Sequence, residues 1–194
     1  MKQNNWFDPF YIQSHLTEEE VKIQNNIREF CNKELRTKVV IKNRNHEFDK
    51  NLYLKFGSIG VLGQTIKSHG GSGTSNLAYG LAAYEIEKID SSYRSSISVQ
   101  SALVIHPINE FGSESQKDKF LPDLIKGEKI GCFGLTESEA GSDPSSMKTT
   151  FKKIKDGYIL NGSKNWITNA PIADIFIIWA IEENKDNKNI KGFI

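Results

Sequence analysis

The first two-thirds of the chain repeats apolar residues at helical spacing. Thr17 and Glu20 stand in the positions of a capping box, a common signal for the start of a helix. Behind them, apolar residues recur three or four positions apart, on one face of the predicted helix: Ile23, Ile27, Phe30 and Cys31. The pattern predicts an amphipathic helix whose apolar face enters a core.

Three more helices are expected before residue 113. Their predicted ranges are 49–60, 77–89 and 92–112. Thr74 or Ser75, in a loop rich in glycine and serine, can cap the second of these helices. The pair Asp90 and Ser91 ends that helix and begins the third. This part of the chain therefore favours an all-helical arrangement.

After Gly127 the pattern changes from helix to strand. Ser113 and Gln116 repeat the capping-box pattern and open a last helix, which stops at Gly127. Beyond it, the sequence predicts strands, with one polar turn at 184–189, over residues 129–137, 157–169, 174–183 and 190–194. A further turn at Asn161 and Gly162 is expected inside the second strand.

The last residue, Ile194, is apolar and stands in the middle of a predicted strand. An open strand edge with apolar side chains is unfavourable at the end of a domain, so we expect the sequence to be a fragment. The predicted fold class is α+β. An all-helical domain over residues 1–128 precedes an incomplete, β-barrel-like domain over residues 129–194.

Composition narrows the class of protein. Hydrophobic residues make up 38% of the chain, charged residues make up 25%, and the net charge is +1. This balance gives no electrostatic reason to expect binding to nucleic acid or to an acidic membrane. No signal peptide or transit peptide is recognisable at the N-terminus, which favours a cytoplasmic protein. The two cysteines, Cys31 and Cys132, lie far apart in the sequence and are expected to be buried, reduced thiols.

Several common site patterns are absent or weak. The glycines Gly70, Gly71 and Gly73 lack the lysine of a phosphate-binding loop and are interpreted as a plain loop. His106 has no second ligand at helical spacing, so we expect a core residue and no metal site. No serine occupies a nucleophile elbow.

Two segments remain as candidates for chemistry. In "FGLTESEAGSD" a strand brings Leu135 and Thr136 to its end, and Gly141 allows a ligand to approach the backbone. In "NWITN" a flat apolar side chain, Trp166, stands two residues from the hydroxyl of Thr168. A flavin ring needs an apolar surface against its faces and hydrogen-bond partners at its heteroatoms. Each segment alone could be a hydrophobic strand closed by a turn, but the two in this order favour a flavin site.

The paired segments "CFGLTESEAGSDPSSM" and "LNGSKNWITNAPIADIFIIWA" resemble those of the acyl-CoA dehydrogenases, and the resemblance extends over essentially all 194 residues. It implies FAD as the cofactor, with Thr136 near the pyrimidine end of the flavin, Thr168 near N5 and Trp166 covering the ring. It also places Ser142 against the CoA arm of the substrate. The FAD-binding residues that it implies are Phe133, Leu135, Thr136, Gly141, Ser142, Trp166, Ile167 and Thr168.

The helix over residues 92–112 carries an arginine that leaves two interpretations open. Arg94 and Ser98 are four residues apart and share a helical face, where a guanidinium could pair with a carboxylate. The other interpretation is a surface ion pair between Arg94 and Asp90, and the pattern alone favours this pair. Within the family, this segment is most similar to the glutaryl-CoA dehydrogenases. That similarity implies binding of the distal carboxylate by Arg94, Ser95 and Ser98, with Glu87 in the same network.

The resemblance also implies a reaction and its partners. A glutamate base removes the α-proton of glutaryl-CoA while a hydride leaves the β-carbon, and loss of CO2 gives crotonyl-CoA. The electrons pass to an electron-transfer flavoprotein, and the enzyme is a homotetramer.

The family's catalytic base lies beyond Ile194, and neither Glu87, Glu137 nor Glu139 matches it, so no catalytic residue is assigned and the chain alone is expected to be inactive. The alternatives are another short- or branched-chain acyl-CoA dehydrogenase and a non-catalytic flavin or acyl-CoA binding module.

Overall fold

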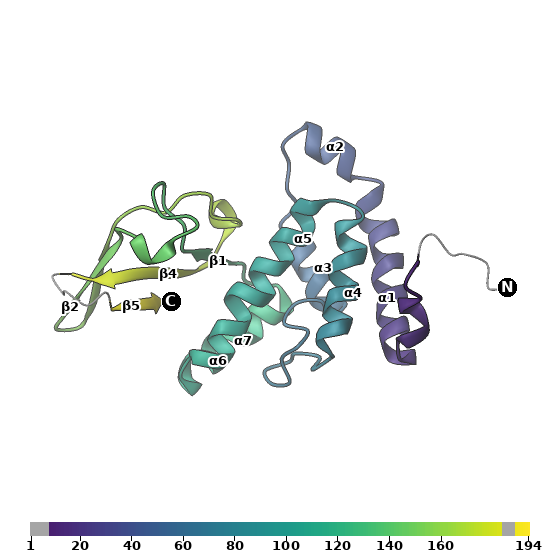
Figure 1. Ribbon diagram of the computed structural model, residues 1–194, viewed down its shortest axis with the longest axis horizontal. Coiled ribbons are helices and arrows are strands. Elements are labelled where there is room, and N and C mark those ends of the chain that lie inside the picture. The colour runs from purple at the N-terminus through teal and green to yellow at the C-terminus, as the bar shows by residue number, and fades with distance from the viewer. Residues whose placement is uncertain (1–7, 184–188) are drawn as a thin grey trace.

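The protein folds into a helical part followed by a small mixed sheet (Figure 1). The computed structural model describes residues 8–183 and 189–194. The α-helices of the first part are α1 (Glu18–Phe30), α2 (Val39–Arg44), α3 (Leu52–Ser58), α4 (Asn76–Glu87), α5 (Ser91–Ser98), α6 (His106–Phe111) and α7 (Glu114–Lys126). The strands are β1 (Gly131–Gly134), β2 (Thr150–Ile154), β3 (Gly157–Asn161), β4 (Ile175–Glu182) and β5 (Ile190–Phe193). The predicted α+β class is confirmed.

Local signals place the helix ends where the sequence predicts them. Thr17 and Glu20 form both hydrogen bonds of a capping box at the start of α1. Ser75, rather than Thr74, caps α4 by accepting a hydrogen bond from the backbone of Ala78. The last helix, α7, ends at Gly127, which has the left-handed φ of 75° that glycine tolerates best.

The predicted helix over residues 92–112 is helical throughout, but its middle is not α-helical. Between α5 and α6 the chain forms a π-helical segment, Val99–Ile105. Shorter helical pieces that the apolar pattern did not predict are the 3₁₀ turn Ile12–His15, the π-helical turn Cys31–Arg36, and α2. A π segment inside a helix is uncommon and is frequently found beside a functional site.

Strand β4 is the centre of the sheet. Ile178 pairs with Gly134 of β1 on one side and with Phe193 of β5 on the other. Further along, Ile181 pairs with β2 on one side and with β5 on the other. Strands β1 and β2 therefore run along the same edge of β4, parallel to it. The segment between them, residues 135–149, leaves the sheet and returns to the same edge.

The strand predictions are confirmed in part. Strands β1, β4 and β5 lie within their predicted ranges, whereas the polar turn predicted at 184–189 falls almost entirely outside the described residues. The strand predicted over 157–169 is wrong in its second half, because β3 ends at Asn161 and the chain then leaves the sheet. The partner of β3 is β2, which was not predicted, and the two join in an antiparallel hairpin.

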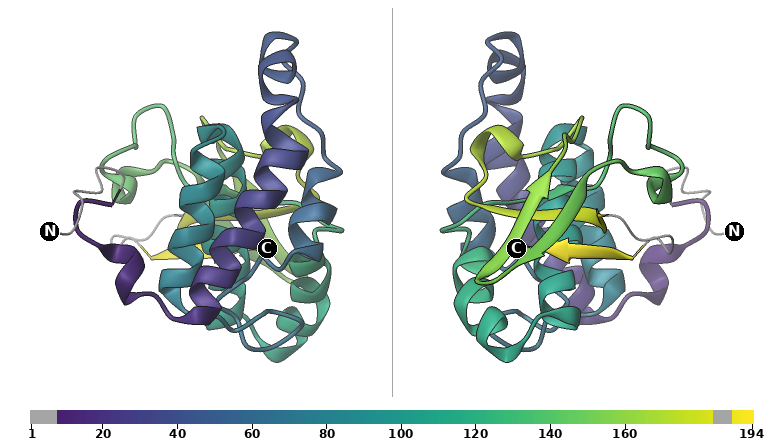
Figure 2. Two further views of the ribbon diagram at one scale, coloured as in Figure 1. Left: turned by 90° about the vertical axis from the view of Figure 1, so that its right-hand side faces the viewer. Right: turned by 90° about the vertical axis from the view of Figure 1, so that its left-hand side faces the viewer.

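One continuous hydrophobic core joins the helices to the sheet. The alternate β4 residues Ile175 and Ile177 are buried in the same cluster as the side chains of the helices, while Phe176 points away and is 43% exposed. Figure 2 shows the strands lying across one side of the helices. Gly131 allows this close approach, because a Cβ at this position would lie 2.5 Å from Cγ1 of Val104 in the π-helical segment.

A buried glutamine also fastens the two parts to each other. Gln100 is fully buried, and its Nε2 donates hydrogen bonds of 2.9 Å to the backbone carbonyls of Leu124 and Lys129. Its Oε1 accepts a hydrogen bond of 2.7 Å from the backbone N–H of Gly131, the first residue of β1. One side chain of the π-helical segment thus fixes the end of α7 and the start of β1.

Candidate functional site

The first candidate segment follows directly after β1. Leu135 and Thr136 are half-buried beyond the end of the strand, and Gly141 and Ser142 are exposed. Between them the chain makes a tight turn, in which the backbone groups of Glu137 and Ala140 exchange hydrogen bonds of 3.1 and 3.2 Å. The residues on both sides of this turn are therefore at least partly accessible to solvent.

Phe133 differs from the rest of this segment. Its ring packs against the core and meets the ring of Trp179 edge-on, with 5.9 Å between the centroids. Its side chain thus lies on the face of β1 that packs against the helices.

The second candidate segment is an irregular stretch, not a strand. No turn forms at Asn161 and Gly162, where one was expected, because Asn161 is the last residue of β3 and the chain continues without regular structure. Trp166 takes a left-handed φ of 60°, which is rare for a bulky residue. Its indole is 90% exposed. Ile167 and Thr168 are half-buried beside it. A strained backbone that presents a large aromatic ring to solvent is a feature of binding sites.

The two segments, about thirty residues apart in the sequence, are joined by hydrogen bonds. The backbone N–H of Asn165 donates to the carbonyl of Thr136 at 2.9 Å. The ammonium group of Lys164 donates to the carbonyl of Leu135, also at 2.9 Å. The two candidate flavin segments thus lie side by side, with the Phe133 ring as the exception that faces the core.

A buried ion pair strengthens this junction. Nζ of Lys164 lies 2.7 Å from Oε1 of Glu137, and each side chain is only 8% exposed. The Glu137 carboxylate also accepts hydrogen bonds from the backbone N–H groups of Lys148 and Thr149, at 2.6 and 3.0 Å. Burial alone would raise the pKa of Glu137, but hydrogen bonds from Lys164 and Thr149 outweigh it and lower the pKa to about 2. Glu137 is therefore a fixed carboxylate that orders the loop.

This surface fits a flavin in its chemistry. The exposed indole of Trp166 offers an apolar plane. Within residues 8–183 and 189–194, no hydrogen bond engages the hydroxyl of Thr136 or that of Thr168, so both remain able to bind a heteroatom of a ligand. A ring with apolar faces and polar edges matches this arrangement.

The third candidate group lies at the junction of α4 and α5. Nε of Arg94 donates a hydrogen bond of 2.6 Å to Glu87, which also accepts a bond of 2.6 Å from the Ser91 hydroxyl. Hydrogen bonds from Ser91 and Arg94 lower the pKa of Glu87. Nη1 of Arg94 lies 3.5 Å from the Ser98 hydroxyl, at the limit of a hydrogen bond. Ser95 is half-buried on the same helix.

The alternative ion pair between Arg94 and Asp90 is not formed. The carboxylate of Asp90 instead caps α5 by accepting a hydrogen bond of 2.8 Å from the backbone of Ser92. Asp90 is therefore part of the helix start, and Glu87 is the partner of Arg94.

Arg94 and Ser98 also line a narrow cleft between α4 and α5. The rest of the lining is mainly apolar and consists of Val61, Tyr79, Ala82, Ala83, Ile86 and Ile97. In this structure the cleft is too narrow to hold a water molecule, so the side chains that line it are packed against one another.

Other features of the described residues do not form a site. His106 is exposed, so its expected place in the core is wrong, and the glycines near residue 70 lie in an irregular loop, as predicted. Cys31 and Cys132 are buried and free, and burial raises the pKa of each thiol to about 11. No cluster of metal-binding side chains and no helix long and apolar enough to cross a membrane occurs among the described residues.

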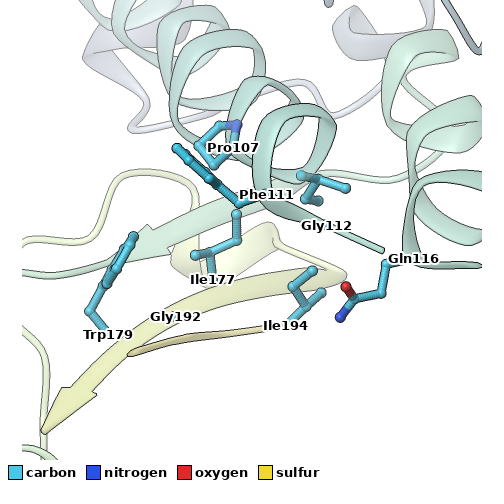
Figure 3. A pocket seen from close by; sticks show the side chains of 9 residues that line it. Pro107, Phe111, Gly112, Gln116, Ile177, Trp179, Gly192 and Ile194 are labelled. Carbon is cyan, nitrogen blue, oxygen red and sulfur yellow. The ribbon is translucent and has the colours of Figure 1, made fainter. Parts of the chain in front are cut away.

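A second hollow, seen in Figure 3, lies between the helices and the sheet. Phe111 and Pro107 cover it from α6, and Ile177 and Trp179 from β4. None of the lining residues is ionisable. It is a mainly apolar space, and none of the candidate residues above is part of its lining.

Comparison with protein families decides the identity. The family model "Acyl-CoA dehydrogenase, N-terminal domain" matches residues 17–128, more than half of the chain. The model "Acyl-CoA dehydrogenase, middle domain" matches residues 132–194. The chain belongs to the acyl-CoA dehydrogenase family. Members of this family are FAD-dependent oxidoreductases.

Similar acyl-CoA dehydrogenases differ in their substrates. An acyl-CoA dehydrogenase of Bacillus subtilis is 38% identical over 182 residues, which are 93% of this chain and 48% of that protein. Isovaleryl-CoA dehydrogenase of Pongo abelii is 40% identical over 169 residues, 85% of this chain and 40% of that protein. A structure of glutaryl-CoA dehydrogenase from Mycobacterium smegmatis, in complex with FADH2, superposes with a TM-score of 0.90 at 38% identity. It covers 95% of this chain and 47% of that one.

This acyl-CoA dehydrogenase chain thus spans about half the length of the relatives it matches or less. The family is shared by all of these proteins, whereas the named substrates are not. The comparisons therefore assign the family and leave the acyl chain to be argued from the residues.

Sequence reasoning missed three side chains that organise the site of this acyl-CoA dehydrogenase. Lys164 and Glu137 join the two candidate flavin segments, and Gln100 fixes β1 to the helices. No local pattern distinguishes these residues, because their partners are remote in the sequence. From the sequence alone, a lysine with charged or polar neighbours is predicted to lie on the surface.

Proposed function

We propose that the whole protein is an FAD-dependent acyl-CoA dehydrogenase whose substrate is glutaryl-CoA. The residues that we propose to hold FAD come from the two joined segments: Phe133, Leu135, Thr136, Gly141, Ser142, Trp166, Ile167 and Thr168. Two observations support this assignment: the surface that unites both segments, and the exposed indole of Trp166. When bound, FAD supplies a hydride acceptor for the β-carbon of the substrate.

The roles of the protein groups follow from their positions. Trp166 covers one face of the ring and excludes water from it. The hydroxyls of Thr136 and Thr168 bind polar atoms at its edge. Ser142, exposed beyond the tight turn, contacts the CoA arm of the thioester.

No glutamate of this chain is proposed as the catalytic base. Glu137 is buried in an ion pair with Lys164, and Glu87 is paired with Arg94. A base must take up a proton near neutral pH, and the low pKa of Glu137 makes it a poor acceptor. We propose that the base is a glutamate elsewhere in the whole protein.

The observation that carries the choice of substrate is the arrangement around Arg94. Glu87 binds the Nε side of the guanidinium and holds its plane, and Nη1 lies near Ser98. None of the described residues accepts a hydrogen bond from Nη2. The outer edge of the guanidinium can therefore receive a carboxylate, with Ser98 as a further donor. Ser95, on the same helix, completes the polar group that we propose for the distal carboxylate.

The fate of the products is part of the same proposal. Glutaryl-CoA oxidation is followed by loss of CO2 to give crotonyl-CoA. The electrons leave to an electron-transfer flavoprotein, and the whole protein is a cytoplasmic homotetramer.

A second candidate is an acyl-CoA dehydrogenase for a short or branched acyl chain. The 40% identity to isovaleryl-CoA dehydrogenase favours it. The side chains around Arg94 between α4 and α5 are mainly apolar, which also favours an uncharged chain. The two candidates differ in what they require of Arg94, since a chain without a carboxylate gains nothing from a guanidinium.

Replacing Arg94 by alanine in the FAD-loaded whole protein tests the proposal. We expect the kcat/KM for glutaryl-CoA to fall by about thirtyfold more than that for butyryl-CoA, because a charge-assisted hydrogen bond is lost for the diacid only. Arg44→Ala, on the exposed end of α2, serves as the control and should change neither value. Equal losses for the two substrates would contradict the carboxylate assignment and favour the short- or branched-chain enzyme.

A further inference from the structure

Asn169 is a buried polar residue that directly follows the Trp166–Thr168 segment. It is 7% exposed, and its side-chain amide points into the junction between the helices and the sheet. Nδ2 donates one hydrogen bond to the backbone carbonyl of Ser96, at 3.3 Å, and another to the carbonyl of Gly131, at 3.1 Å. Both protons of the amide are therefore used on two separate elements.

These two carbonyls belong to the other two parts of the proposed site. Ser96 lies in α5, between Arg94 and Ser98. Gly131 is the first residue of β1, the strand that leads to Thr136. One amide group thus contacts the backbone of the helix that presents the guanidinium and the backbone of the first flavin strand. Asn169 itself adjoins the second flavin segment.

The helix is irregular at the point where Asn169 reaches it. The backbone N–H of Val99 bonds to the carbonyls of both Ser95 and Ser96, where the α-helix changes into a π-helical segment. The hydroxyl of Tyr53, a fully buried residue, also donates to the carbonyl of Ser96, at 3.3 Å. The change of helix type therefore coincides with a carbonyl that accepts hydrogen bonds from two side chains outside its own helix.

The backbone at this position also suits asparagine. Asn169 has a φ of 69° and a ψ of −11°, in the left-handed region where asparagine, aspartate and glycine are the residues best tolerated. The left-handed backbone restricts the residues that could replace Asn169 to glycine and aspartate, and these two variants can be compared. Glycine keeps the backbone shape without the amide. Aspartate keeps the shape and places an acceptor where the donor was.

We infer that Asn169 is a positioning residue that sets the distance between the flavin and the carboxylate-binding helix α5. This inference rests on the proposed function. A thioester that contacts the flavin at one end and Arg94 at the other requires a fixed distance between these two sites. A thioester without the distal carboxylate requires only the first. Asn169 therefore acts on substrate selection through Ser96, without touching the substrate.

A purely structural role for Asn169 makes a different prediction. If it only stabilised the fold, its loss would reduce the amount of folded protein and affect all ligands alike. A register role changes the preference between ligands while the folded, FAD-loaded fraction binds both. The ratio of two dissociation constants separates these cases, because it does not depend on the amount of folded protein.

The experiment uses the FAD-loaded whole protein with Asn169→Asp or Asn169→Gly. The protein is mixed rapidly with glutaryl-CoA or with butyryl-CoA under anaerobic conditions, and the rate of flavin reduction is measured from the flavin absorption. The dependence of this rate on the concentration of each substrate gives its dissociation constant. We expect the preference for glutaryl-CoA to fall about tenfold in Asn169→Asp, because the charge-assisted hydrogen bond between Arg94 and the distal carboxylate is weakened when α5 moves. A smaller fall is expected in Asn169→Gly. Asn43→Asp, on the exposed face of α2, makes the same chemical change away from the site and should leave the preference unchanged.

The outcomes separate the inference from the proposed function. If the Asn169 variants retain the glutaryl-CoA preference of the unaltered protein, the positioning role is wrong while the proposed function stands. If the unaltered protein shows no preference for glutaryl-CoA, or binds no FAD, the proposed function fails and the inference fails with it. Hydrogen exchange gives a second test: the Asn169→Asp variant should exchange faster than the unaltered protein in both 163–168 and 95–100. Loosening of only one of these segments would contradict a tie between them.

Discussion

The ammonium group of Lys164 lies 2.7 Å from the carboxylate of Glu137, and both side chains are buried. Each residue sits in one of the two segments that we propose to contact FAD. Lys164 reaches further, to the carbonyl of Leu135. The pair therefore joins the segment that follows β1 to the segment that follows β3. An ion pair in this position orders the surface on which the flavin is proposed to lie.

Removal of the cation should destabilise the protein. In Lys164→Met the carboxylate of Glu137 stays buried without its charged partner, which costs about 3 kcal/mol of unfolding free energy. Urea denaturation measures this loss. The double variant Lys164→Met with Glu137→Gln removes both charges and should regain part of it. A loss below about 0.5 kcal/mol in the single variant would mean that the pair behaves as an exposed one.

The same pair predicts a dependence of stability on pH. The pKa of Glu137 is about 2 in the folded protein and 4.5 ordinarily, so the folded state binds the proton less tightly than the unfolded state. Its contribution to stability is complete above pH 4.5 and is lost as the pH falls toward 2. The decrease amounts to roughly 1.4 kcal/mol for each pH unit in this window.

The measurement compares unfolding free energies of the unaltered protein and Glu137→Gln between pH 6 and pH 2. The difference between the two proteins should shrink as the pH falls. A difference that stays constant through this window would show that the carboxylate does not titrate with a lowered pKa.

Trp166 is expected to lower the stability of the FAD-free protein and to strengthen FAD binding. Its left-handed backbone is unfavourable for a tryptophan, and a ring that is 90% exposed gains little from packing. Trp166→Gly should therefore raise the unfolding free energy of the FAD-free protein by about 1 kcal/mol. The same change should weaken FAD binding about tenfold through loss of the stacked ring.

Trp166→Phe provides the matched control, since it keeps the backbone constraint and a smaller aromatic face. We expect it to match the unaltered protein in stability and to bind FAD with intermediate affinity. Thermal unfolding and FAD titration measure the two effects. A Trp166→Gly variant that is less stable without FAD would contradict the interpretation of Trp166 as a strained binding residue.

Gln100 should be essential for the attachment of β1 to the helices. Gln100→Leu introduces an apolar side chain of similar size and leaves the carbonyls of Leu124 and Lys129 and the N–H of Gly131 without their partner. The expected loss is about 3 kcal/mol, because buried backbone groups are costly when unpaired. Urea denaturation with both far-ultraviolet circular dichroism and Trp fluorescence would check it. A loss under 1 kcal/mol would mean that water or another side chain takes over these bonds.

The helical part could be predicted from the sequence because its signals are local. Thr17 with Glu20, and Ser113 with Gln116, form capping boxes within four residues, and Gly127 ends its helix as expected. By contrast, β2 carries two lysines and buries only Phe151 among its five residues, so its apolar pattern is too weak to indicate a strand. It becomes a strand because β3 and β4 offer it hydrogen-bond partners.

The candidate site was predictable in its residue types but not in its geometry. The sequence indicates that Thr136, Trp166 and Thr168 belong together, and the resemblance to acyl-CoA dehydrogenases gives each a role. The left-handed backbone of Trp166 and the ion pair between Lys164 and Glu137 depend on contacts between remote segments. No periodicity encodes such contacts, so the expected strand through residues 162–169 is instead an irregular loop.

The central claim is that a flavin binds where these two segments meet. Titration of FAD into the purified whole protein, followed by its absorption and fluorescence, tests it most directly. We expect one equivalent of FAD per chain in the unaltered protein, and clearly weaker binding in the Thr136→Val, Thr168→Val double variant with unchanged stability. A protein that takes up no FAD, or a double variant that binds it as tightly as the unaltered protein does, would contradict the account.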